Sequence, residues 1–158
     1  MEKNEFERYA VKYKDTVYRV ALNFTCCPED AEDAVQEVLM RLYTARGGFH
    51  GEEHVKRWMI RVTLNYCRNL ARAAKRRSPV PPEELGLCVP FEAEEQLGLF
   101  TTVMSLPEKY RVPLYLFYYE EYSVREIAKL MELTESNVTT RLSRARAMMR
   151  AALVEERV

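Results

Sequence analysis

The 158-residue chain lacks most of the sequence patterns on which enzymes and membrane proteins depend. It has only 5 glycines, and none of them belongs to a phosphate-binding loop or a nucleophile elbow. The longest apolar or aromatic run, residues 112–119, is too short to cross a bilayer, and the N-terminus has no signal-peptide segment. We therefore expect a cytoplasmic protein that is not an enzyme, uses no cofactor and does not insert into a membrane.

The cysteines and histidines also lack the spacing that metal ligands have. The four cysteines, Cys26, Cys27, Cys67 and Cys88, are expected to be reduced or buried thiols, although a redox role for the adjacent Cys26 and Cys27 stays open. His50 and His54 lie near two glutamates, but a metal site needs more ligands, and this stretch is interpreted as a solvated loop.

The charges are separated along the chain although the formal net charge is zero. Residues 28–46 hold five acidic and two basic side chains, whereas residues 54–77 hold eight basic and no acidic ones. Residues 80–110 are acidic again, and residues 133–150 are basic. This alternation predicts one partner that is DNA and one that is not.

Apolar spacing predicts an all-α protein. In the first half it indicates helices over residues 5–24, from Pro28 onward, and over residues 54–77. Asn65 and Asn69 are poor helix formers in the third of these. They present their amides to a ligand, or they end one helix and cap the next. The two interpretations are compatible, since a loop could present the amides. Along one side of that helix lie Arg61, Asn65, Arg68 and Arg72.

Four prolines in residues 78–90 predict a semi-rigid linker without helix. The chain is therefore divided into a domain at 1–77, a linker at 78–91 and a domain at 92–158. In the second domain, helices are expected over residues 92–104 and from Leu106–Pro107 to Tyr119. Pro113 should kink the latter helix or move its start.

A helix-turn-helix is the most informative pattern. Ser123 and Glu126 form a capping box, residues 132–134 make the turn, and Thr134 caps the last helix. The second helix of such a motif enters the DNA major groove, where arginine, hydroxyl and amide side chains bind base edges and phosphates. Its inward positions are Val138, Leu142, Ala145 and Met149, and its outward positions include Ser136, Asn137, Thr140, Arg141, Ser143 and Arg144.

Two aromatic groups, Trp58 and residues 115–119, could stack on bases, but they lie in apolar stripes, and core packing is the favoured interpretation.

Three segments in order resemble the extracytoplasmic-function (ECF) group of bacterial RNA polymerase sigma factors. Residues 30–43, DAEDAVQEVLMRLY, resemble the polymerase-binding helix of the first domain, σ2. Residues 57–77 resemble its promoter minus-ten segment, and residues 106–150 resemble the second domain, σ4, which binds the minus-thirty-five element. The resemblance implies a σ2-like helical bundle and a σ4-like helix-turn-helix joined by the proline-rich linker.

The resemblance also implies partners and site residues. Core RNA polymerase would be bound through the clamp helices of its largest subunit and, by σ4, through its second-largest subunit. An anti-sigma factor, which could hold the protein at the membrane, is a further expectation. The polymerase-binding residues would be Asp33, Gln36, Glu37, Met40 and Arg41. The minus-ten residues would be Arg61, Asn65, Arg68, Asn69, Arg72, Lys75, Arg76 and Arg77. The minus-thirty-five residues would be Ser136, Asn137, Thr139, Thr140, Arg141, Ser143 and Arg144.

The chain departs from the family pattern at three positions. Glu132 and Ser136 stand where glycine is common, and Thr139 stands where a basic residue is frequent. A stand-alone helix-turn-helix regulator, with the first half binding another protein, is the alternative function. An all-helical enzyme is the third class, and nothing in the sequence favours it.

Overall fold

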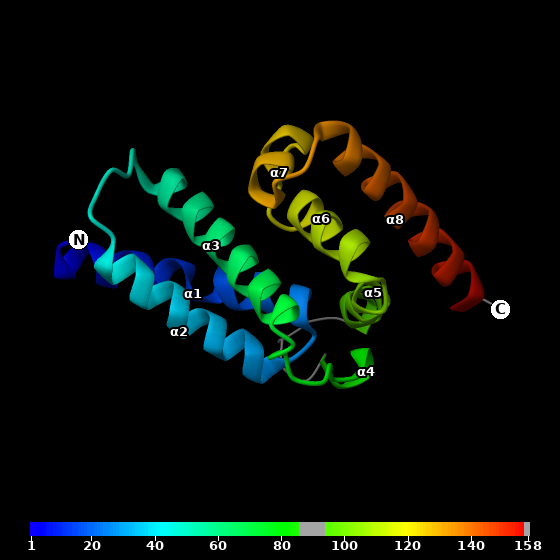
Figure 1. Ribbon diagram of the computed structural model, residues 1–158. Coiled ribbons are helices and arrows are strands. Elements are labelled where there is room, and N and C mark those ends of the chain that lie inside the picture. Colours follow the sequence, from blue (N-terminus) through cyan, green and yellow to red (C-terminus); the bar gives the residue numbers. More distant parts are fainter. Residues whose placement is uncertain (86–93, 157–158) are drawn as a thin grey trace. The chain divides into compact units, whose positions relative to one another are not determined.

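A computed structural model describes residues 1–85 and 94–156, in which helices are present and strands are not (Figure 1). The predicted all-α class is confirmed. The chain divides into two compact units, Met1–Ser78 and Pro79–Val158. Within the described ranges, no helix is both long enough and apolar enough for a membrane crossing.

The first unit is a bundle of α1 (Lys3–Thr25), α2 (Pro28–Thr44) and α3 (Glu52–Arg72), each packed against the other two (Figure 1). Apolar residues at helical spacing face inward, as the periodicity predicts. One buried cluster draws on all three helices and contains Tyr9, Tyr13, Val17, Val38, Leu42, Val55 and Met59.

A tight turn joins α1 to α2. Cys26 has a left-handed backbone with φ 53°, and Pro28 occupies the start of α2, as predicted. The Thr25 hydroxyl donates to the carbonyl oxygen of Ala21 at 2.8 Å and accepts from the backbone N–H of Cys27 at 3.3 Å. The buried backbone groups of this turn are thereby satisfied, which fixes where α2 begins.

The third helix is shorter than predicted, because it ends at Arg72 rather than at residue 77. Ala74 adopts φ 53°, and the N–H of Lys75 donates to the carbonyl oxygen of Leu70 at 3.1 Å, which closes the helix. Residues 75–77 therefore lie on non-helical chain. The helix is continuous through both asparagines, so the interpretation in which they end one helix and cap another is wrong.

The prediction that the proline-rich segment contains no helix is wrong. Pro82–Leu85 form one turn, α4, with Pro82 at its first position, where a missing N–H breaks no helical hydrogen bond. Residues 86–91 of the predicted linker, with Cys88, and the first two residues of the helix predicted from residue 92 lie outside the described residues.

The second unit contains α5 (Glu94–Met104), α6 (Glu108–Tyr118), α7 (Val124–Met131) and α8 (Glu135–Glu156). Helices α6 and α7 pack against each other and against α8. Met149, predicted to face inward, is only half-buried. The buried core includes Val112, Leu116, Ile127, Leu130, Val138, Leu142 and Ala145.

Helix α6 continues through Pro113. Proline has no N–H to donate to the carbonyl four residues earlier, which belongs to Lys109. That carbonyl oxygen instead accepts from Nη1 of Arg141 on α8 at 3.5 Å, the long limit of a hydrogen bond. The proline in α6 thus leaves an acceptor that holds a predicted DNA-binding side chain.

The helix-turn-helix forms as predicted. The Ser123–Glu126 capping box is complete, and Thr134 Oγ1 accepts from the N–H of Asn137 at 3.1 Å at the start of α8. Helix α7 ends at Met131 and is followed by Glu132, which has φ 58°, and the N–H of Leu133 donates to the carbonyl oxygen of Ala128 at 2.9 Å. A glutamate therefore occupies a left-handed position that glycine adopts without steric cost.

Replacing this glutamate is expected to stabilise the second unit. A left-handed backbone costs an L-residue about 1–2 kcal/mol, and glycine removes this strain. Part of the gain in stability is offset, because glycine makes the unfolded chain more flexible. Glu132→Gly should raise the free energy of unfolding by about 0.5–1 kcal/mol, measured by chemical denaturation. Lys129→Gly, inside the same helix, is the control and should lower it by about 1 kcal/mol. Equal losses for both variants would contradict the strain at Glu132.

Candidate nucleic-acid and protein interfaces

The face of α2 that points away from the bundle core carries the residues predicted to bind polymerase. Gln36, Met40 and Arg41 are exposed, while Asp33 and Glu37 are half-buried. Arg41 Nε donates to Glu37 Oε1 at 2.9 Å, one helical turn away. Met40 is 66% exposed, so a large apolar side chain stands in this otherwise polar row. Such a row suits a protein partner rather than nucleic acid.

Tyr43 extends this row and was missed by the sequence prediction. It is 56% exposed and lies one turn beyond Met40. Its ring packs edge-on against Phe6 of α1, with ring centroids 5.2 Å apart. The spacing of residues 36, 40 and 43 on one helical side could have identified it.

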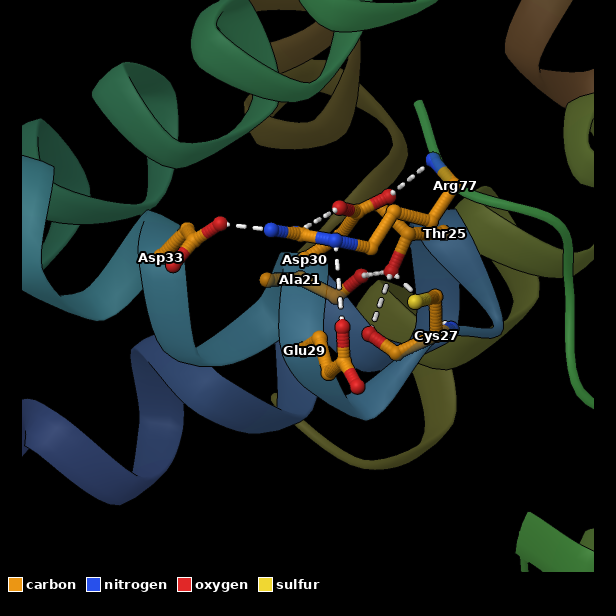
Figure 2. A network of polar contacts seen from close by, with 7 residues as sticks. All are labelled: Ala21, Thr25, Cys27, Glu29, Asp30, Asp33 and Arg77. Atoms are coloured by element: carbon orange, nitrogen blue, oxygen red, sulfur yellow. Dashed lines mark hydrogen bonds and ion pairs between the residues drawn. The ribbon is translucent and has the colours of Figure 1, made fainter. Parts of the chain in front are cut away.

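The N-terminal end of α2 holds a four-residue ion-pair network (Figure 2). Arg77 Nη1 lies 2.7 Å from Asp30 Oδ1 and 2.7 Å from Asp33 Oδ2, and Arg77 Nε lies 3.1 Å from Glu29 Oε2. The backbone N–H of Arg77 also donates to Asp30 Oδ2 at 3.0 Å. Hydrogen bonds to Asp33 and then to Asp30 raise the pKa of the Arg77 guanidinium above its usual value.

The predicted minus-ten face lies on α3. Three of its side chains are exposed, those of Arg61, Asn69 and Arg72. Two are half-buried, those of Asn65 and Arg68. Arg68 Nη2 donates to Asn65 Oδ1 at 2.8 Å, so the amide oxygen is already engaged and the amide N–H groups are those left to meet a ligand.

Tyr66 of α3 lies near the acidic residues of α2. Burial, followed by the negative charges of Asp33 and Glu37, raises the pKa of its phenol.

The predicted minus-thirty-five face lies on α8 and is exposed at Ser136, Asn137, Thr139, Thr140, Ser143 and Arg144, with Arg141 half-buried. Arg141 Nε donates to Asn137 Oδ1 at 2.7 Å, in addition to the contact of Arg141 with α6. Tyr110 lies beside Lys109 and Arg144. Hydrogen bonds from both side chains lower the pKa of the Tyr110 phenol, and that from Lys109 has the larger effect. These contacts pre-order two arginines before any ligand is bound.

The aromatic segment 115–119 is not wholly core. Tyr115 is buried, but Tyr118 and Tyr119 are 54% and 50% exposed, which contradicts the core interpretation for those two. Arg146, which was not predicted as a site residue, donates from Nε to the Tyr118 hydroxyl at 2.8 Å. Its guanidinium also lies 5.3 Å from the centroid of the Phe117 ring. Trp58, in contrast, is half-buried against the core cluster of the first unit.

The histidines and cysteines hold no metal cluster within the described residues. The rings of His50 and His54 stack with centroids 5.6 Å apart, and the N–H of His50 donates to His54 Nδ1 at 2.9 Å. Cys26, Cys27 and Cys67 are buried thiols.

A helical unit with separate acidic and basic faces, followed by a helix-turn-helix unit, is the architecture of a DNA-binding transcription factor. Two family models match the chain: Sigma-70 region 2 over residues 10–77, and Sigma-70 region 4 over residues 98–149.

Curated relatives agree with the family models. The ECF RNA polymerase sigma factor SigM of Bacillus subtilis is 31% identical over 88% of this chain and 89% of its own length. The RNA polymerase sigma-H factor of Pseudomonas aeruginosa is 27% identical over 96% of this chain and 88% of its own.

Solved structures share the fold. The sigma factor RpoE of Bartonella quintana, solved in complex with the anti-sigma factor NepR, superposes with a TM-score of 0.72 at 17% identity, covering 94% of this chain and 96% of that one. CnrH, solved with the cytosolic domain of CnrY, gives 0.68 at 23% identity, covering 98% and 90%.

The chain belongs to the ECF group of the sigma-70 family of RNA polymerase sigma factors. It binds core RNA polymerase and directs it to promoters. A stand-alone helix-turn-helix regulator is not favoured, because the match extends over both units.

Proposed function

We propose that residues 1–77 form a σ2 domain whose α2 face binds the clamp helices of the largest polymerase subunit. The observation that carries this is the separation of charge within one bundle, with acids on α2 and the cationic row on α3. The residues that bind polymerase are Asp33, Gln36, Glu37, Met40 and Arg41, with Tyr43 added by its exposure.

The basic row on α3 binds minus-ten promoter DNA. Its phosphate contacts come from arginines, and Asn65 donates its amide N–H groups to the edge of an extruded base. The hydrogen bond from Arg68 to Asn65 supports this assignment, because it holds the amide in one orientation. Residues 92–158 form a σ4 domain in which the exposed residues of α8 read the minus-thirty-five duplex, and residues 78–91 link the two domains.

The chain itself makes and breaks no covalent bond in this function; polymerase synthesises the RNA, in the cytoplasm. An anti-sigma factor regulates the protein by covering one of its polymerase-binding surfaces. The two solved structures support this, since one was solved with an anti-sigma factor and the other with a cytosolic domain of a second protein.

Run-off transcription with core enzyme and genomic DNA, followed by sequencing of the RNA 5′ ends, tests the proposal as a whole. The purified protein should create a set of start sites that core enzyme alone does not use. Unchanged start sites would contradict it.

Asn65→Ala is expected to impair open-complex formation more than duplex binding. Loss of a good base-edge contact corresponds to about 1–3 kcal/mol, or roughly 5- to 150-fold. Permanganate footprinting of the melted region, beside a mobility-shift assay on duplex promoter, separates the two effects. Asn65→Asp keeps an acceptor for Arg68 but has no N–H to donate, and it should be as defective as Asn65→Ala in open-complex formation. Its added negative charge also weakens duplex binding, so the two assays are compared for Asn65→Ala. Equal losses in both assays would count against base capture.

A further inference from the structure

Arg77 connects two parts of the first unit that are far apart in sequence (Figure 2). Its side chain meets Glu29, Asp30 and Asp33 on the first turns of α2, while its own backbone N–H is held by Asp30, 47 residues away. Figure 2 shows the guanidinium lying across the start of α2, with the three carboxylates around it. Both the side chain and the main chain at residue 77 are thus fixed to α2.

The three carboxylates differ in exposure. The Asp30 side chain is 2% exposed and its two oxygens are taken up by Arg77, whereas the Asp33 side chain is 45% exposed. Asp30 therefore anchors Arg77 within the fold. Through the same Nη1 atom, Arg77 then holds one oxygen of Asp33 and leaves the other side of that carboxylate to a partner.

We propose that Arg77 is a positioning residue of the polymerase-binding face and not a ligand of promoter phosphates. This inference rests on the proposed role of Asp33 in polymerase binding. Arg77 fixes the Asp33 carboxylate in one rotamer before polymerase arrives, which lowers the ordering cost of binding. A guanidinium already surrounded by three carboxylates would have to break those bonds to reach a phosphate.

Core-polymerase affinity of the full chain tests the positioning role. Arg77→Lys keeps the countercharge for Asp30 but cannot reproduce the planar fork, and Arg77→Gln removes the charge as well. Both should weaken binding by about 3- to 10-fold, the cost of ordering one side chain. Lys14→Gln, an exposed position on α1, makes the same change in net charge as Arg77→Gln and should leave the affinity unchanged. Wild-type affinity for Arg77→Lys would overturn the inference, since charge alone would then suffice.

A double-mutant cycle with Asp33→Asn separates positioning from a general effect on folding. If Arg77 acts through Asp33, Arg77→Lys should cause less than a twofold further loss in the Asp33→Asn background. Losses that multiply would overturn the inference. Because this arm uses Arg77→Lys, it stays informative even if Arg77→Gln fails to fold.

Salt dependence of promoter binding by the assembled holoenzyme tests the exclusion of a phosphate contact. Arg72→Gln should reduce the slope of log K against log salt by about 1, as expected for a lost phosphate contact. Arg77→Gln, which removes the same charge from residue 77, should leave the slope unchanged. A slope reduced by Arg77→Gln as much as by Arg72→Gln would overturn the inference.

The two proposals fail differently. If Asp33→Asn itself leaves core affinity unchanged, the proposed polymerase face is wrong and the inference falls with it. If Asp33→Asn weakens binding but both Arg77 variants bind like wild type, only the inference is wrong.

Discussion

The combined Asp33→Arg and Glu37→Arg variant is expected to bind core RNA polymerase at least about 100-fold more weakly than the wild type, because like charges juxtaposed at an interface cost several kcal/mol. The structure adds two local reasons. Reversing Glu37 places a cation one turn from Arg41, and reversing Asp33 places a cation beside Arg77. The row of polymerase-binding residues on α2 then holds no acidic side chain and repels a partner that it attracted before.

Equilibrium titration of labelled protein with core enzyme measures this loss. The matched control is Glu5→Arg with Glu7→Arg, which makes the same change in net charge at exposed positions of α1. Circular dichroism should report the same helix content in both variants. Equal losses in the two double variants would show a non-specific charge effect and would contradict the assignment of α2 as the polymerase face.

Leu142→Ala is expected to cost about 2–5 kcal/mol of stability, because truncation of a buried leucine leaves a cavity. Leu142 is 1% exposed on α8, among the helices of the helix-turn-helix. A unit of this size has a small stability reserve, so the loss should lower its melting temperature by at least about 10 °C.

Two thermal transitions should then be resolved, since the first unit has its own core. Binding to a minus-thirty-five duplex should follow the lower transition. Ala147→Ser, exposed on the same helix, is the control and should change stability by less than about 0.5 kcal/mol. A single transition shifted as a whole would contradict independent cores.

The α8 helix shows how much of a candidate site local sequence can predict. Its apolar period placed Val138, Leu142 and Ala145 inside, and the exposed positions between them followed without knowledge of the fold. The same logic failed for Tyr118 and Tyr119. They lie in an aromatic run, and only the neighbouring helices decide which side of α6 is covered.

The helix α3 that carries the basic row was predicted correctly in kind but not in its length. Good helix formers and a continuous pattern extended it to residue 77, whereas the chain turns at Ala74. A left-handed alanine has no strong sequence signal, because glycine or asparagine is the usual residue at such a position.

The sequence by itself determined the long helices, most of their inward faces, the capping box and the family, because these depend on short spacings and on residue chemistry. Only the tertiary structure decided that Arg77 binds the carboxylates of α2 and that Arg141 reaches the carbonyl left open by Pro113. The physical reason is that a cation chooses its partner by distance and burial. For Arg77 that partner lies 47 residues away, where no local pattern points to it.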